Sequence, residues 1–469
     1  MSDFDELCGH ELIRNFDIAA CLGSFLDNGT GSFLARLDSP ISTRPIRRAL
    51  NLARLLQTAT HVPGLEIFRE GVLKELAVIL EGMDAKYLWD IFQEGGRLSA
   101  TYSSAKILLG LGGSGLSQLR AEQSCNTPKL LHEHLESMLQ DRLDAHPFLI
   151  ALSVDALHSC GLLNEPSRRK AGEWADRYLY MLQSQLDHVG PGSIAAINLC
   201  LALGVVAHHN LGALSRQRMS SLLGALVKYY PVLPTHARAA ITRLEGHAVG
   251  CSAVDALLPL VTSEFVVGEL FSTHASYLLD VLRWLWDHSV IRPNGARVFA
   301  TDVFIDERPY ELWFNSAVCH FLRDLRVRCA LGWRDVVVRG MGGGRVDGAF
   351  PWDDLKIGGY RWPAVIKSRL IQEGRQISNR GGRLEQNGMI LFGPPGTTKT
   401  SVVESMAATI DWPLVTLGPG RFLDEGTDKV FRRIDEVFNA LTKLEHAVVL
   451  FAYSGQAEGC LGLKARGSS

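Results

Sequence analysis

The chain has 469 residues, and its 48 Lys and Arg against 50 Asp and Glu give a formal net charge of −2. This near balance argues against a dedicated binder of nucleic acids or anionic membranes, because there is no overall excess of positive charge. Hydrophobic residues make up 46% and charged residues 21%, which excludes a disordered protein and is typical of a globular one. At about 150 residues per domain, two or more domains are expected.

The nine cysteines are scattered along the chain without a Cys-x-x-Cys pair. This pattern predicts reduced thiols in a cytoplasmic protein rather than a disulfide framework or a zinc site. The acidic N-terminal stretch MSDFDELCGHELIRNFD lacks the apolar core of a signal peptide. The longest mainly apolar run, Ile194 to Ala207, falls short of the ~18 residues expected of a membrane-spanning helix, so it predicts a buried helix.

Apolar residues recur at helical spacing from about residue 40 to 330, and strand-like alternation is nearly absent there. Short breakers such as 190–192 and 231–234 separate the helical stretches, as in antiparallel helices joined by short loops. We therefore predict an all-α helical domain over residues 1–338. The clearest single-face stripes are Leu131, Leu135, Met138, Leu139 and Leu143; Met219, Leu222, Leu223, Leu226 and Tyr230; and Leu278, Leu282, Leu285 and Trp286.

The composition changes at residues 339–350, where a run of glycines predicts a flexible linker between domains. Short apolar strands then alternate with helices, which is typical of a parallel α/β unit. We predict such a partial module over 351–451, followed by a tail at 452–469 without helical or strand periodicity. The expected strands are 389–392, 413–417 and 447–451, and the expected helices begin near residues 399 and 428.

The residues that carry chemistry lie between the first of these strands and its helix. A strand, a glycine loop and a helix follow one another in the order that a phosphate-binding cradle requires. Backbone N–H groups of the loop can surround a β-phosphate, Lys399 can reach the β- and γ-phosphate oxygens, and the Thr400 hydroxyl can ligate Mg²⁺. The predicted nucleotide-binding residues are Gly393, Pro394, Pro395, Gly396, Thr397, Thr398, Lys399 and Thr400.

One position departs from the P-loop, or Walker A, pattern G-x-x-x-x-G-K-[ST]. Thr398 stands where the pattern has its last glycine. Its Cβ and hydroxyl must tolerate close approach of the phosphates, so the sequence predicts an altered cradle rather than a lost one.

Residues 351–451 resemble the AAA family of ATPases. The octet GPPGTTKT is similar to the family's phosphate loop, Trp352 to Gly359 to its opening segment, and Ala447 to Phe451 to its second nucleotide strand. The resemblance implies ATP and Mg²⁺ as cofactors and a ring-forming homo-oligomer that couples ATP hydrolysis to the remodelling of a partner. The helical domain would then recognise a protein partner.

The second nucleotide strand departs from the family at its end. The family places Asp-Glu there, where the Asp supports Mg²⁺ and the Glu polarises the attacking water, whereas this sequence has Ala452 and Tyr453. Neither residue supplies a carboxylate, so we expect ATP binding with impaired hydrolysis and assign no catalytic residue. One hypothesis is a truncated or frame-shifted version of an intact ATPase. A natural nucleotide-binding fragment is the other, and both stay open.

Other motifs have simpler interpretations. Gly110 to Gly115 satisfies G-x-G-x-x-G but lies outside any βαβ pattern, so a glycine-rich break between helices explains it better than a dinucleotide site. His132-Glu133-His134 lacks the i, i+4 spacing of a metal site and predicts a solvated helix face.

The competing function is a helical protein-interaction scaffold whose P-loop is vestigial.

Overall fold

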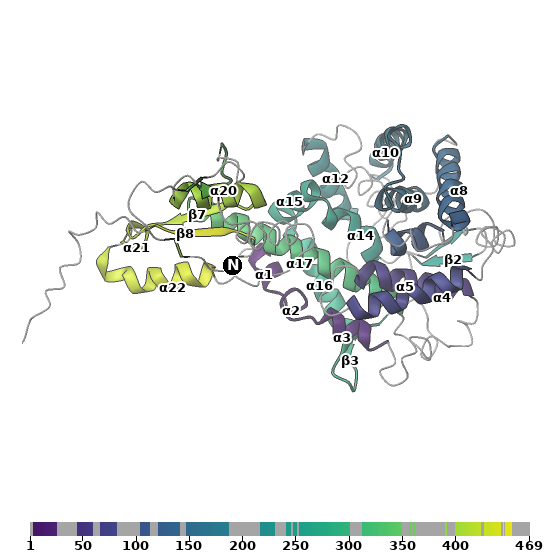
Figure 1. Ribbon diagram of the computed structural model, residues 1–469. Coiled ribbons are helices and arrows are strands. Elements are labelled where there is room, and N and C mark those ends of the chain that lie inside the picture. The colour runs from purple at the N-terminus through teal and green to yellow at the C-terminus, as the bar shows by residue number, and fades with distance from the viewer. Residues whose placement is uncertain are drawn as a thin grey trace, which may run out of the picture. The chain divides into compact units, whose positions relative to one another are not determined.

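The computed structural model divides by its contacts into two compact units, Met1–Arg328 and Cys329–Ser469 (Figure 1). The structure describes residues 3–25, 45–59, 66–81, 104–112, 121–140, 147–186, 216–229, 241–244, 247–250, 253–300, 312–348, 356–357, 360–361, 390–391, 399–423, 426–441, 444 and 446–452.

The first unit is mostly helical, as the spacing of apolar residues predicted. Residues 104–112 form a further helix. The named helices are α1 (Asp3–Gly9), α2 (Glu11–Arg14), α3 (Ile18–Gly23), α4 (Pro45–Ala59), α5 (Glu66–Glu81), α8 (Ala121–Gln140), α9 (Pro147–Ser159), α10 (Glu165–Leu186), α12 (Arg216–Tyr229), α14 (Ala253–Thr262), α15 (Glu264–Thr273), α16 (Ala275–Asp287) and α17 (Leu312–Gly340), the last of which continues into the second unit.

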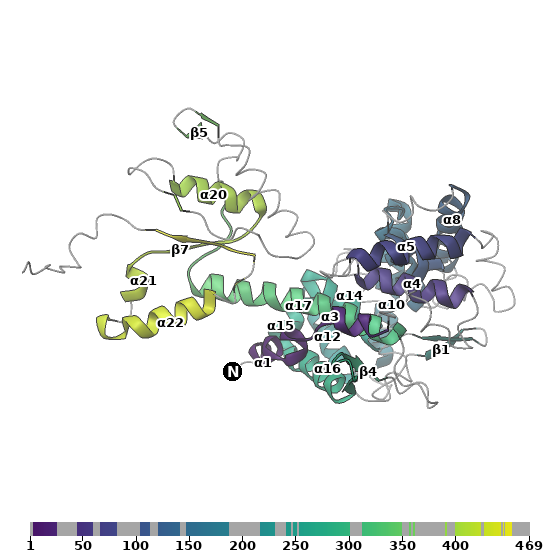
Figure 2. The same cartoon turned by 60° about the horizontal axis from the view of Figure 1, so that its bottom comes forward.

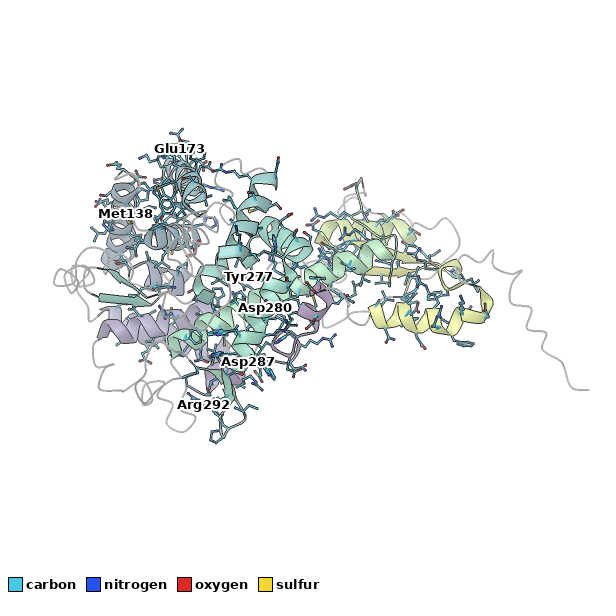
Figure 3. The ribbon with its side chains drawn as sticks, turned by 180° about the vertical axis from the view of Figure 1, so that it is seen from behind. Met138, Glu173, Tyr277, Asp280, Asp287 and Arg292 are labelled. Carbon is cyan, nitrogen blue, oxygen red and sulfur yellow. The ribbon has the colours of Figure 1, made fainter. Side chains whose placement is uncertain are left out.

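The three predicted stripes are buried at every described residue except Trp286. Helix α8 buries four of its five stripe residues and α12 four of its five, while Leu143 and Tyr230 lie outside the described residues. Helix α16 buries Leu278, Leu282 and Leu285, but Trp286 is only half-buried. Figure 3 shows Tyr277, Asp280 and Asp287 along this same helix, with the tyrosine buried and both aspartates exposed.

Two antiparallel hairpins interrupt the helices, and neither was expected from the sequence. The first pairs β1 (Ile241–Leu244) with β2 (His247–Gly250), and the second pairs β3 (Ser289–Ile291) with β4 (Arg297–Phe299). Gly295 in the second turn has φ +82°, a conformation that glycine adopts without steric cost. The guanidinium of Arg297 lies 3.8 Å from the centre of the Trp286 ring, which joins the hairpin to α16.

Helix 104–112 approaches α4 closely at Gly110. A Cβ at this position would lie 2.3 Å from the carbonyl oxygen and 2.5 Å from the Cα of Ala53. Two helix backbones can come this near only where one of them has no side chain. Gly110 is therefore a packing residue inside a helix, which corrects the expectation of a break between helices at this residue; residues 113–115 lie outside the described part.

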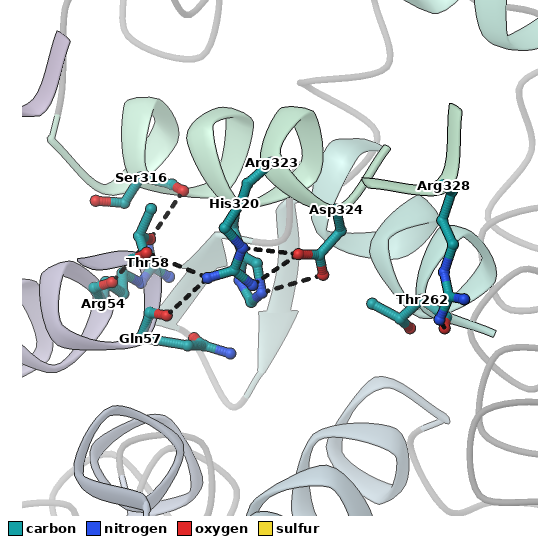
Figure 4. A network of polar contacts seen from close by, with 9 residues as sticks. All are labelled: Arg54, Gln57, Thr58, Thr262, Ser316, His320, Arg323, Asp324 and Arg328. Atoms are coloured by element: carbon teal, nitrogen blue, oxygen red, sulfur yellow. Dashed lines mark hydrogen bonds and ion pairs between the residues drawn. The ribbon is translucent and has the colours of Figure 1, made fainter. Parts of the chain in front are cut away.

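Helix α17 forms the polar framework of the first unit (Figure 4). Its Arg323 pairs with Asp324 at 2.7 Å and donates to the carbonyl of Thr58 at 3.2 Å, near the end of α4. The Thr58 hydroxyl in turn donates to the carbonyl of Ser316 at 3.1 Å. Arg328 donates to the carbonyl of Thr262, the last residue of α14.

The second unit contains a small parallel α/β layer. Strands β7 and β8 pair in parallel, α20 packs on one face of the pair, and α22 with the end of α17 packs on the other (Figures 1 and 2). The elements are β5 (Lys356–Ile357), β6 (Tyr360–Arg361), α20 (Lys399–Ile410), β7 (Leu414–Leu417), α21 (Gly420–Leu423), the 3₁₀ helix η4 (Thr427–Lys429), α22 (Val430–Leu441) and β8 (Val448–Phe451).

Alternate strand residues build the two cores of this layer. Leu414, Val448 and Leu450 join the cluster around α20, whereas Val415, Leu417 and Val449 join the cluster around α22 and Val338 of α17. This is the two-residue period of a strand covered by helices on both faces. The predicted strands 413–417 and 447–451 therefore form, as does the expected helix that begins near residue 399.

The glycine segment packs against this layer where the structure describes it. Gly344 and Leu414 exchange two backbone hydrogen bonds, of 3.1 and 2.8 Å. A Cβ at Gly343 would lie 2.6 Å from the carbonyl oxygen of Leu414, so the close approach depends on glycine. The compact units divide earlier, between Arg328 and Cys329. The proposed domain bounds of 1–338, 339–350, 351–451 and 452–469 stay a prediction.

We expect Gly110→Ala to destabilise the first unit by at least ~1–3 kcal/mol, because the new methyl group overlaps the backbone of Ala53. The matched control is Gly71→Ala in α5, where a Cβ meets nothing within 4 Å. This control should stabilise the protein by about 0.5–1 kcal/mol, since alanine favours a helix over glycine. Urea unfolding followed by circular dichroism compares the two, and equal effects would contradict the close packing.

Candidate nucleotide-binding site

The described part of the predicted phosphate loop is the start of α20. Lys399 and Thr400 are its first two residues, Lys399 half-buried and Thr400 exposed. The first turn of a helix carries N–H groups without intrahelical acceptors and the positive end of the helix dipole. This end of α20 therefore combines a helix N-terminus, an ammonium group and an accessible hydroxyl, which are groups suited to binding a phosphate and its metal ion.

Helix α20 ends in a tight turn that leads directly into β7. The N–H of Trp412 donates to the carbonyl of Ala407 at 2.9 Å, and the N–H of Asp411 donates to that of Ala408 at 3.3 Å. With Asp411 at φ +57°, these bonds form a Schellman motif with an aspartate at the position usually held by glycine. The connection is so short that α20 must run back along β7.

This reversal fixes the end of the sheet at which Lys399 and Thr400 lie. Helix α20 returns over the strand pair and shares a core with it, so the start of the helix lies toward the carboxyl ends of β7 and β8. Ligands of parallel α/β sheets bind outside the carboxyl ends of the strands. The two predicted residues thus lie at the end of the sheet that suits a nucleotide.

The strand expected before the loop is not seen at its two described residues. Ile390 and Leu391 are not in a strand, which corrects the prediction at these positions. Leu391 packs against the core around α20, whereas Ile390 is 89% exposed. Met389 and Phe392 lie outside the described residues, as do six predicted loop residues: Gly393, Pro394, Pro395, Gly396, Thr397 and Thr398.

Ala452 occupies the end of β8. Its N–H donates to the carbonyl of Leu417 at 3.0 Å, so the parallel ladder continues through this residue. The strand period puts its side chain on the same face as Val448 and Leu450, the face covered by α20. Position 452 is therefore directed to the side of the sheet on which Lys399 and Thr400 lie, and it offers a methyl group there. Tyr453 lies outside the described residues.

A comparison with family models finds a similarity over this part of the chain. Residues 389–452 match the model of the ATPase family associated with various cellular activities (AAA). This match supports an AAA-family ATPase. No curated protein and no solved structure matched the chain. The match begins before the predicted phosphate loop and ends at Ala452, so it contains both described residues of the site and the end of β8.

No described helix is both long and apolar enough to cross a lipid bilayer. Within the described residues, no group of three or more His, Cys, Asp or Glu side chains is arranged to hold a metal ion.

His132 does not lie on a plain solvated face, which corrects that expectation. Its Nε2 atom lies 2.9 Å from both the Asn164 amide nitrogen and the Ser167 hydroxyl. Ser167 also donates to Glu136, which pairs with Lys170. Sequence reasoning missed that His132 and Glu136 are four residues apart and so lie on one side of α8. This side faces the first turns of α10. The group joins two helices and has the character of a structural contact.

Several opposing effects set the pKa of Glu136. Burial raises it, but hydrogen bonds from Lys170 and Ser167 and the positive charge of Lys170 outweigh burial, so the pKa is lowered. A carboxyl group whose pKa is lower in the folded state stabilises the fold above its unfolded pKa. This contribution is lost as the pH falls through the folded-state pKa.

We expect Glu136→Gln to lower the free energy of unfolding at pH 7 and to reduce its decline below about pH 4.5, the ordinary pKa of this group. Chemical unfolding at pH 7, 5, 4 and 3 measures both effects. Glu133→Gln, on the exposed face of the same helix, is the control and should leave the acid dependence unchanged. A parallel shift of the Glu136→Gln curve at every pH would refute the assigned role.

Proposed function

We propose that the C-terminal unit binds ATP with Mg²⁺ at the start of α20. The proposal rests on one observation. The octet that ends in Lys399 and Thr400 leads into a helix that returns over a parallel strand pair and begins at the carboxyl end of that pair. The family match over 389–452 supports the same assignment. Fold alone does not fix a function, so the proposal depends on these residues.

Each residue has a separate role in this proposal. Lys399 would contact the β- and γ-phosphate oxygens, and the Thr400 hydroxyl would ligate Mg²⁺. The amides from Gly393 to Lys399, except those of Pro394 and Pro395, would form the cradle. When bound, Mg²⁺ neutralises charge on the phosphates.

We propose further that this chain hydrolyses ATP poorly. Phosphoryl transfer requires a held metal ion and an oriented water molecule. The side chain of Ala452 faces the α20 side of the sheet but has no oxygen with which to hold either one, and Tyr453 follows it where the resemblance predicts a glutamate. The chain's own residues would thus bind and orient the nucleotide without supplying the carboxylates that hydrolysis requires.

The wider role follows from the family resemblance. We propose that an intact protein of this kind assembles into a cytoplasmic homo-oligomer and uses ATP hydrolysis to remodel a protein partner. The helical first unit would recognise that partner. A scaffold with a vestigial P-loop would bind no ATP. Calorimetry measures this difference directly.

We expect Mg·ATP to bind the full chain with micromolar affinity in titration calorimetry. The substitution Lys399→Ala should weaken this binding by ~10- to 100-fold. This range corresponds to the ~1.5–3 kcal/mol of a hydrogen bond to a charged group. Thr400→Ala should remove the dependence of binding on Mg²⁺, whereas Thr400→Ser should retain it.

Lys429→Ala is the matched control, because Lys429 is an exposed lysine of the same unit, in η4. It should bind Mg·ATP as the unaltered chain does. A chain that binds no ATP, or a Lys399→Ala variant that binds equally well, would refute the nucleotide site and favour the scaffold.

We expect the double substitution Ala452→Asp with Tyr453→Glu to raise ATP turnover by at least ~10-fold, since an acid–base group in position contributes ~10²–10⁴-fold. Phosphate release under saturating Mg·ATP measures the gain. The uncharged pair Ala452→Asn with Tyr453→Gln is the control and should stay at the level of the unaltered chain. Rapid Lys399-dependent hydrolysis by the unaltered chain would contradict the proposed impairment.

A further inference from the structure

Two buried cysteines that are far apart in the sequence lie near each other in the first unit. Cys21 lies in α3 and Cys319 in α17, and neither side chain is exposed to solvent. Cys21 is near enough to Cys319 to raise the pKa of that thiol. Nothing in the sequence suggests this pair, because almost 300 residues separate its members.

The amide of Asn315, one helical turn before Cys319, fixes the position of the pair. The Cys21 thiol donates to the Asn315 oxygen at 3.7 Å. The same amide accepts a hydrogen bond from the N–H of Phe299 at 2.8 Å and donates to its carbonyl at 3.0 Å. Cys21 therefore lies against a side chain that is held from both sides by β4.

We propose that Cys21 and Cys319 form a reversible disulfide bond, which makes this buried pair a redox modification site of the first unit. The Cys21 sulfur lies against Asn315, which is one turn before Cys319 on the same side of α17, so the bond requires only a local shift of the two side chains. The bond would join the N-terminal segment α1–α3 to α17 covalently. Among the described cysteines, Cys8 and Cys160 are half-buried, and Cys329 lies in α17 within the second unit.

The oxidant is a low-molecular-weight disulfide such as oxidised glutathione. One protein thiolate attacks it and forms a mixed disulfide, releasing one glutathione thiolate. The second protein thiolate then attacks the protein sulfur of that mixed disulfide and releases the other. The two cysteines lose two protons and two electrons in total, and the oxidant becomes two glutathione thiols.

Burial makes this reaction slow and dependent on pH. Desolvation, followed by the influence of the neighbouring Cys21 thiol, raises the pKa of Cys319 well above its ordinary value. The thiol is thus protonated at neutral pH, and only the thiolate reacts. Access of the oxidant requires local opening, for which the short helices α2 and α3 are suited. We expect oxidation to accelerate as the pH is raised from 7 to 9.

The test is oxidation of the native full chain with oxidised glutathione, followed by alkylation, proteolysis and mass spectrometry without reduction. We expect the Cys21–Cys319 peptide pair to be the main intramolecular link, to disappear on treatment with dithiothreitol, and to be absent from Cys21→Ser. Cys8→Ser, altered in the same N-terminal segment, should retain it. The oxidised chain should also melt at a higher temperature than the reduced one, and this shift should be lost in Cys21→Ser.

Three results would overturn the proposal. Cys21 and Cys319 could remain thiols after prolonged oxidation at pH 9, carry glutathione separately, or link mainly to other cysteines. Because Cys319→Ser places a hydroxyl group in the core and could prevent folding, the decisive measurement is the peptide map of the unaltered chain. A parallel sample oxidised in urea gives the pattern of links expected without a native contact.

Discussion

The helical unit depends on arginines of α17 that donate to backbone carbonyls of other segments. Arg323 reaches the end of α4, Arg326 reaches the carbonyl of Phe16 at 2.8 Å, and Arg328 reaches the last residue of α14. The carbonyls at a helix end have no intrahelical donors and carry the negative end of the dipole, so a guanidinium satisfies both requirements. One helix thereby holds the ends of two others, α4 and α14, as well as the segment between α2 and α3.

The sequence predicted what depends on local spacing. Apolar residues three and four apart marked the helices α8, α12 and α16, because each buries one face. Short apolar runs between helices marked β7 and β8, whose two faces are both covered by helices. The start of α20 at Lys399 followed from the phosphate-loop pattern. Only a few residues connect α20 to β7, so the helix must run back along the strand. The location of its start at the carboxyl end of the strands therefore also follows from the sequence.

Features that depend on distant contacts could not be predicted in this way. Gly110 was read as a break because its neighbour Ala53 is far away in the sequence, and the Cys21 thiol could not be matched to Cys319 for the same reason. The side of the sheet to which Ala452 is directed required the register of β8 against β7. His132 was judged by its immediate neighbours, whereas its partners Asn164 and Ser167 begin another helix.

The pairing of Gly344 with Leu414 limits where the second unit can be divided from the first for expression. A recombinant fragment that starts at residue 351 would remove Val338 from the core and leave one edge of β7 without its backbone partner. Exposed strand edges recruit other chains, so such a fragment should aggregate. A fragment that starts at Cys329 retains both contacts, and is the better choice for producing the nucleotide-binding unit alone.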